Sequence, residues 1–178
     1  MTRKGSHTKL GIVLIFFYFV FCECSKAAGV PIHHSLPGAT NIIYINVLGA
    51  TITATQWNRD FGTTTYVAKP LNFDGVAGLS AAEQTAISRI WARVAEDYIP
   101  WRVDVTTERP ATFTATTGTI LITEDVDANG VALPGQGGGG IAYLNVFGVS
   151  SYSRYSLCLH HCLAMLHACV LVSNQCAL

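Results

Sequence analysis

Cysteine and charge are scarce over most of this sequence. No cysteine occurs between Cys24 and Cys158, although half of the 178 residues are hydrophobic. Disulfide frameworks spread their cysteines along a chain, so the body of this protein must fold around an apolar core instead. The 11 basic and 11 acidic side chains balance to a formal net charge of zero. No basic run occurs beyond the extreme N-terminus, so the sequence offers no electrostatic basis for binding nucleic acid.

The N-terminus has the pattern of a secretory signal peptide. Basic residues precede an apolar run of twelve residues, 10–21, and Ser25 and Ala27 fit the −3 and −1 positions of a cleavage site. We therefore expect a signal peptide at 1–27 and a secreted protein. The alternative is an uncleaved membrane anchor, but crossing a bilayer needs about 20 apolar residues. We expect no stable membrane span after cleavage.

Residues 41–156 have the pattern of one domain, which we expect to follow a linker at 28–40. Alternating apolar residues from Ile43 predict a strand, and a second β-rich run at 51–53 follows a turn at Gly49.

The strongest local pattern predicts a long helix. Ser80 and Glu83 have the spacing of a capping box, and Pro100 ends the segment. Its apolar stripe consists of Ile87, Ile90, Trp91, Val94 and Tyr98.

Three further strands are expected at 101–106, 119–123 and 140–148, from alternation or short apolar runs. Together the elements predict an α+β fold, in which a twisted mixed sheet carries one long helix on a face. The helical connection between strands should be a right-handed crossover.

Several segments resemble the N-terminal half of secreted zinc metallopeptidases of the metzincin type, and are closest to a family common in marine microbes. They are "IYINVLGATITATQWN", "IWARVAEDYIPWRVDVTTERP", "ILITEDVDANG" and "GGGGIAYLNVFG", in that order within residues 41–150. The resemblance implies that residues 41–156 are the N-terminal subdomain of a metzincin catalytic domain, incomplete at its C-terminus. It also implies zinc as the cofactor of the full-length family and a peptide or protein as substrate.

The resemblance further implies that "GIAYLN" is an edge strand that holds an extended peptide by backbone pairing. Its expected substrate-binding residues are Gly140, Ile141, Ala142, Tyr143 and Leu144.

The signature that such an enzyme needs next, H-E-x-x-H-x-x-G-x-x-H, does not occur in this sequence. Asp127 is the last acidic residue, so no glutamate follows it to act as a base. We therefore assign no catalytic residue and expect a truncated metallopeptidase-like protein without activity of its own and with no zinc bound. A truncated product, an alternative transcript or read-through of non-coding sequence fits this pattern. The alternative is a non-enzymatic secreted module that pairs peptides or a partner along 140–146.

The tail, 157–178, shares no recognisable pattern with the family. Its histidines and cysteines are possible ligands for Zn(II) or Cu(I), but their spacing matches no finger or knuckle pattern. We favour a hydrophobic helix in which cysteine packs as a small apolar residue, and which could cover surface left by the missing half. The candidate metal ligands are His160, His161 and His167.

Acidic and aromatic residues of the body receive structural interpretations. Residues 125–136 begin like a calcium loop, but Gln136 replaces the bidentate carboxylate, and an Asn-Gly turn explains the same residues. We expect the other body carboxylates to be solvated or capping, and the tryptophans to lie in the core or at its rim. These residues are Glu96, Asp97, Asp104 and Glu108, and Trp57, Trp91 and Trp101.

Overall fold

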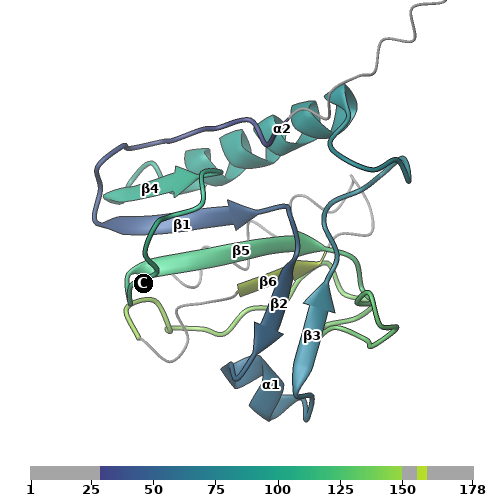
Figure 1. Ribbon diagram of the computed structural model, residues 1–178. Coiled ribbons are helices and arrows are strands. Elements are labelled where there is room, and N and C mark those ends of the chain that lie inside the picture. Colours follow the sequence, from purple (N-terminus) through teal and green to yellow (C-terminus); the bar gives the residue numbers. More distant parts are fainter. Residues whose placement is uncertain (1–28, 150–155, 160–178) are drawn as a thin grey trace, which may run out of the picture.

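A computed structural model describes residues 29–149 and 156–159 (Figure 1). The signal peptide predicted at 1–27 lies outside this part of the chain. The described residues combine strands with one long helix, which confirms the predicted α+β class. The elements are β1 (Asn41–Asn46), β2 (Ala50–Thr53), α1 (Gln56–Asp60), β3 (Thr65–Ala68), α2 (Ala81–Asp97), β4 (Val103–Thr106), β5 (Thr117–Thr123) and β6 (Ser156–Leu159).

The main sheet is parallel and has the order β4-β1-β5-β6. In the middle of this sheet, Ile43 of β1 lies beside Val105 of β4 and Gly118 of β5. Parallel neighbours need a connection that returns the chain to the starting end of the sheet, and α2 lies in the connection from β1 to β4. The separate β2-β3 pair is antiparallel and supplies the mixed strand directions.

α2 begins at the predicted capping box. The Ser80 hydroxyl accepts a hydrogen bond from the Glu83 N–H at 3.3 Å, and the Glu83 carboxylate accepts one from the Ser80 N–H at 2.8 Å. The predicted apolar stripe is buried at Ile87, Ile90 and Val94, and Trp91 is half-buried beside it. The face of α2 that the sequence period predicts to be apolar is therefore the face that packs against the main sheet.

The main sheet is covered by apolar side chains on both faces. Leu121 and Ile122 are neighbours on β5 but belong to different clusters, because successive strand residues point to opposite faces. This explains why 119–123 reads as a continuous apolar run. The first core, between α2 and the sheet, includes Ile43, Ile45, Ile87, Ile90, Val94, Val105 and Ile122. The second core contains Ile52, Trp57, Tyr66, Ala68, Leu121 and Leu133.

α1 and β3 are not predicted from the sequence, because they are too short to show a clear period. The hairpin that they complete depends on Gly49, whose φ of +74° favours glycine. A Cβ atom at this position would lie 2.4 Å from the carbonyl oxygen of Ala68. Glycine is therefore required both by the backbone and by the close approach of the facing chain.

The strand predicted at 140–148 is wrong. The segment consists of turns and bends, with a single bridge residue at Ile141. Asn145 and Gly148 have φ values of +57° and +87°, which are left-handed and incompatible with a strand. The alternating apolar residues at 141–147 therefore reflect side chains that pack against the two cores, and not an extended backbone.

The beginning of the tail is also different from the prediction. β6 pairs with β5, with Leu121 beside Leu157 and Ile122 beside Cys158. The predicted boundary between 156 and 157 therefore falls within a strand, and no helix begins at Leu157. Pairing with β6 satisfies the backbone hydrogen-bonding groups along the edge of β5. The local sequence pattern of 157–172 carries no information about this distant partner.

Candidate functional site

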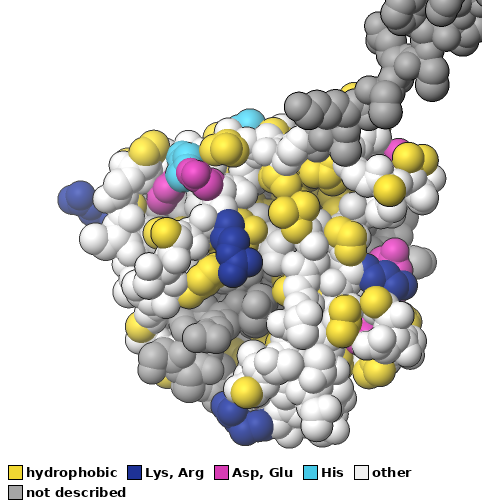
Figure 2. Space-filling model, in the orientation of Figure 1, with side chains coloured by type: hydrophobic (Ala, Val, Ile, Leu, Met, Phe, Trp, Pro, Cys, Tyr) yellow, Lys and Arg dark blue, Asp and Glu magenta, His cyan; other side chains and the backbone are white. Residues whose placement is uncertain are grey.

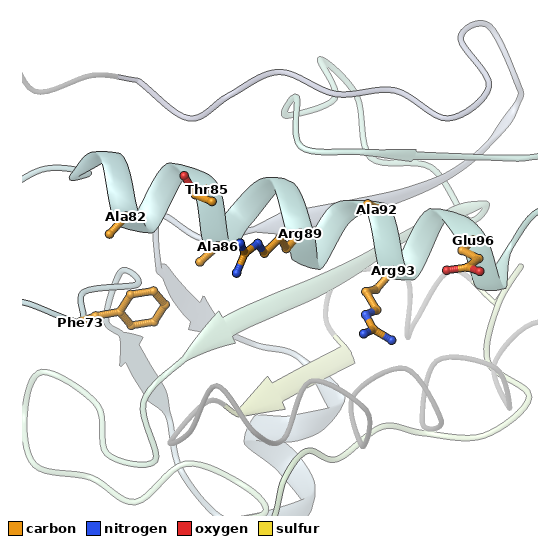
Figure 3. Close-up of a pocket in the computed structure, with 8 residues that line it drawn as sticks. All are labelled: Phe73, Ala82, Thr85, Ala86, Arg89, Ala92, Arg93 and Glu96. Atoms are coloured by element: carbon orange, nitrogen blue, oxygen red, sulfur yellow. The ribbon is translucent and has the colours of Figure 1, made fainter.

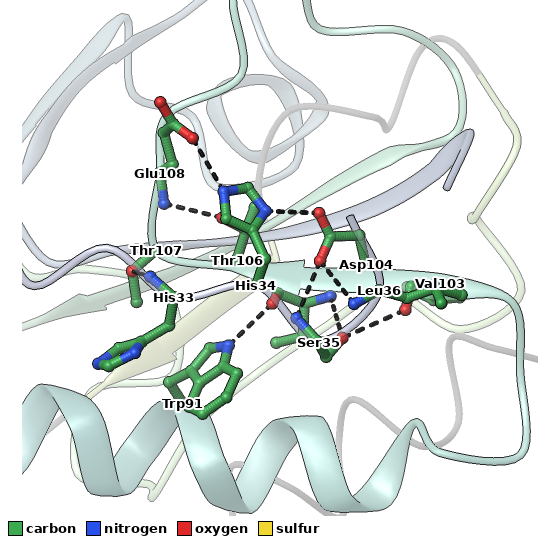
Figure 4. A network of polar contacts seen from close by, with 11 residues as sticks. His33, His34, Ser35, Leu36, Trp91, Val103, Asp104, Thr106, Thr107 and Glu108 are labelled. Atoms are coloured by element: carbon green, nitrogen blue, oxygen red, sulfur yellow. Dashed lines mark hydrogen bonds and ion pairs between the residues drawn. The ribbon is translucent and has the colours of Figure 1, made fainter. Parts of the chain in front are cut away.

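Residues 29–40, which we call the N-terminal strap, make contacts with the main sheet. The strap runs along β4, with an antiparallel bridge between His34 and Thr106. The Ser35 N–H donates to the Val105 carbonyl at 3.0 Å, and the Thr107 N–H donates to the His33 carbonyl at 3.2 Å. This strap brings two histidines to the acidic residues of the β4 region (Figure 4).

His34 lies between two carboxylates that the sequence pattern did not connect to it. Its Nδ1 is 2.7 Å from Asp104 Oδ2, and its Nε2 is 2.8 Å from Glu108 Oε2. The hydrogen bond with Asp104 is the main cause that raises the pKa of His34 above its ordinary value of 6.5, although partial burial opposes the rise. The cluster reaches the surface, where histidine and acidic side chains lie together (Figure 2).

Asp104 is the buried member of this cluster, with 4% of its surface exposed. Its Oδ1 accepts hydrogen bonds from the N–H groups of Ser35 and Leu36 at 3.0 and 3.1 Å. The side chain thus caps backbone amides, as expected, but it is not solvated. Glu108 is more than half exposed.

Asp97 near the end of α2 has a different environment. Its Oδ2 is buried and makes no hydrogen bond within the described residues. Desolvation is the main cause that raises its pKa, and the neighbouring charge of Glu96 adds to the effect. Asp97 is half-buried overall, so one of its carboxylate oxygens is withdrawn from solvent while the residue stays partly accessible.

His33 does not form a nucleophilic pair with Ser88, although its Nε2 lies 2.9 Å from Ser88 Oγ. The serine hydroxyl also donates to the Gln84 carbonyl at 3.0 Å, as serines in helices commonly do. Its single proton is thus engaged, and the serine accepts from the histidine. His33 stacks on Trp91 with ring centroids 4.6 Å apart, which makes it a packing residue.

The His34 cluster does not have the geometry of a zinc site. A tetrahedral site needs several ligand atoms that converge on one point. Here the two carboxylates contact opposite nitrogens of one ring, so these atoms do not converge. In residues 29–149 and 156–159 no group of three histidine, cysteine, aspartate or glutamate side chains could share a metal ion. The candidate ligands His160, His161 and His167 lie outside these residues.

Residues 125–136 form a turn that uses their carboxylates for backbone bonding. Asp127 is buried and accepts from the N–H groups of Val67, Asn129 and Val131 at 2.8 to 2.9 Å. These bonds, with that from Val67 first, lower the pKa of Asp127. Gly130 has a φ of +80°, which supports the Asn-Gly turn interpretation.

The predicted peptide-binding segment is anchored beside α1. Ile141 and Tyr143 pack against the second core, with the Tyr143 ring 4.3 Å from that of Trp57. The Tyr143 hydroxyl donates to the Asp60 carboxylate. Leu144, by contrast, is 56% exposed. Of the predicted substrate-binding residues, the structure therefore places Leu144 outward and Tyr143 against the protein.

An open groove of about 1100 Å³ follows one face of α2 (Figure 3). Alanine side chains line it along α2; Arg89 lies near the middle of the helix, and Arg93 and Glu96 lie towards its C-terminal end. The remaining lining residues are Phe73, Ala82, Thr85, Ala86 and Ala92. The groove contains no histidine or cysteine among these residues.

Comparisons with known proteins give no relative for this chain: no family model matches, and neither curated proteins nor solved structures give a significant match. In the described residues no helix is long and apolar enough to cross a membrane.

Proposed function

We propose that this chain is the N-terminal, non-catalytic part of a secreted zinc metallopeptidase-like protein. The observation that supports the proposal is the arrangement of β1, α2, β4 and β5. These elements contain the segments that resemble the metzincin type, and they form one parallel unit with a single long helix packed on it. A fold of this kind accords with the resemblance, although folds alone do not define activity.

The catalytic step would have to come from residues outside this unit. Peptide hydrolysis by the family uses zinc-activated water and a glutamate base. In the described residues the His34 ring directs both nitrogens at carboxylates, so it has no lone pair directed at a metal. The unit would therefore serve as a scaffold for a catalytic helix.

The sharpest test is the genomic sequence downstream of the codon for Ser156, translated in all three frames. We expect an H-E-x-x-H-x-x-G-x-x-H motif within the next few hundred codons. A downstream region without this motif would contradict the family assignment. A motif in a shifted frame would identify the tail as a product of read-through or alternative splicing.

A biochemical test addresses the absence of activity. The purified secreted chain should not cleave a peptide library, with or without added zinc. Zinc-dependent cleavage that a chelator abolishes would refute this part of the proposal, and a contaminating protease would be recognised by its failure to co-elute with the chain.

A peptide-binding module is the second candidate, and the exposed Leu144 beside the anchored Tyr143 favours it. Because 140–148 is not a strand, a peptide would contact the exposed side chain rather than extend a sheet. We expect Leu144→Asp to weaken binding of a labelled apolar peptide about tenfold or more, as loss of a buried interface contact does. Val149→Asp is the control, since Val149 is also exposed, at 43%. Equal binding by both variants would remove this candidate.

A further inference from the structure

One acidic residue of β4, Asp104, makes several of the contacts that attach the N-terminal strap. Asp104 accepts the Ser35 and Leu36 amides through Oδ1 and faces His34 through Oδ2. The strap also exposes large apolar side chains, with Ile32 65% and Leu36 41% accessible. Polar bonds, rather than apolar burial at these two positions, therefore hold this part of the strap.

The protonation state of the His34 ring decides how many hydrogen bonds the ring can donate to Asp104 and Glu108. An imidazolium donates from both nitrogens, whereas a neutral imidazole has one N–H and one lone pair. Carboxylate oxygens lie at 2.7 Å from Nδ1 and 2.8 Å from Nε2, and both are acceptors when ionised. In the neutral ring one nitrogen lone pair would therefore face a carboxylate without a proton between them, and that contact would become repulsive.

We propose that His34 is a protonation-controlled latch, which holds residues 33–36 against β4 as an imidazolium and loosens them when it becomes neutral. The loosening would make the edge of β4 accessible at the backbone groups of Val105 and Thr107, which the strap now occupies. This inference is independent of the proposed peptidase relationship. The latch would make the attachment of the strap to β4 depend on pH in the range where histidine titrates.

The charges around His34 agree with this role. Asp104 faces the ring from β4, and Glu108 faces it from the chain that follows β4; Thr106 adds a hydroxyl at 3.4 Å from Nε2. From α2, the Ser88 hydroxyl contacts His33 of the strap and the Trp91 Nε1–H donates to the Val105 carbonyl, and neither of these α2 side chains carries a charge.

The cations closest in sequence do not form ion pairs with this cluster in the described structure. Arg109 lies over the ring of Phe113, 5.3 Å from its centroid. The ion pairs of the described residues link Asp104 and Glu108 only to His34.

The direction of the pH effect follows from the same contacts. The pKa of His34 is raised above 6.5, first by the hydrogen bond with Asp104. The latch is therefore closed below about pH 6.5 and opens as the pH rises through the raised value.

Amide hydrogen exchange on the full chain tests the latch at about pH 6 and about pH 8, with correction for intrinsic rates. Protection of the Ser35 and Leu36 amides should fall roughly three- to tenfold at the higher pH, because the neutral ring loses one of its two hydrogen bonds to the carboxylates. Amides in the middle of α2 serve as the reference. Equal protection of Ser35 and Leu36 at both pH values would overturn the proposal.

Three variants assign the response to a residue. His34→Gln should abolish the pH dependence, whereas His33→Gln should retain it. Glu108→Gln removes the exposed partner and should lower the midpoint, because the carboxylate that raises the pKa of His34 from the Nε2 side is lost. This exposed substitution keeps the test available if His34→Gln does not fold. A pH response that survives in His34→Gln, or an unchanged midpoint in Glu108→Gln, would contradict the latch.

Discussion

α2 and the N-terminal strap both pack against β4, but different forces hold them there. α2 buries Ile87, Ile90 and Val94 in the first core. The strap is attached through Asp104 and His34, with a carboxylate that accepts two backbone amides. Apolar burial does not depend on protonation, whereas the contacts of the His34 ring do. β4 therefore carries one contact that is independent of pH and one that depends on it.

Replacing a side chain under α2 should give the largest effect on this comparison. Ile87 is fully buried, and Ile87→Ala should lower the free energy of unfolding by about 2–5 kcal/mol, from lost burial and the cavity left behind. Urea unfolding measures this loss, which should be equal at about pH 6 and about pH 8. Ile99→Ala is the control, because Ile99 is 75% exposed and should change stability by less than about 0.5 kcal/mol. A similar small loss in both variants would mean that α2 is not held by its apolar stripe.

The corresponding substitution for the strap is Asp104→Asn, which should have the second largest effect on the free energy of unfolding. The asparagine side chain keeps the shape of aspartate, and its oxygen can still accept, but it lacks the negative charge that strengthens the bonds from the Ser35 and Leu36 N–H groups. We therefore expect the free energy of unfolding to fall by about 1–3 kcal/mol. Exchange should increase most at the strap amides and least in α2. Asp74→Asn tests a carboxylate on an exposed turn, where its Oδ1 accepts only the Val76 N–H. Uniform loss of protection across both regions would show that the strap is part of the global fold and not a separate attachment.

Trp91 joins the two regions, and its loss should have a smaller effect. Its Nε1–H donates to the Val105 carbonyl at 2.8 Å, and its ring stacks on His33. Val105 keeps the hydrogen bond from Ser35, so Trp91→Phe should cost only about 0.5–1.5 kcal/mol by urea unfolding. Trp101→Phe is a matched aromatic control, since Trp101 packs against Tyr98 at 5.8 Å. Equal losses would indicate that ring packing rather than the indole hydrogen bond matters.

Local pattern sufficed where a short stretch of chain determines its own structure. Ser80 and Glu83 marked the start of α2, and the apolar spacing identified its buried face. The alternation in 41–47 and the apolar run in 119–123 similarly predicted β1 and β5. These elements required no knowledge of distant partners.

The cluster at His34 could not be derived in this way. Asp104 alternates with Val103 and Val105, so a half-buried strand pattern placed it towards solvent. Burial of Asp104 arises from the strap, which is about 70 residues away in sequence. His33 and His34 lacked any periodic neighbour that would mark them as part of the sheet edge. Only the pairing of two distant segments shows that the histidine and the carboxylates share a site.

The smallest expected effect is the pH dependence of global stability that His34 contributes. Its folded-state pKa is raised, so its contribution is fully present below about pH 6.5 and is lost as the pH rises through the raised value. The His34 side chain is 29% exposed and Glu108 is 56% exposed, so solvent screening limits this contribution to about 1 kcal/mol or less. Urea midpoints of the wild type and His34→Gln at the two pH values isolate it, because the other titrating groups are common to both chains. The wild type should lose more stability than the variant on going from about pH 6 to about pH 8. A larger loss in the variant would imply that neutral His34, and not the imidazolium, is the form that stabilises the fold.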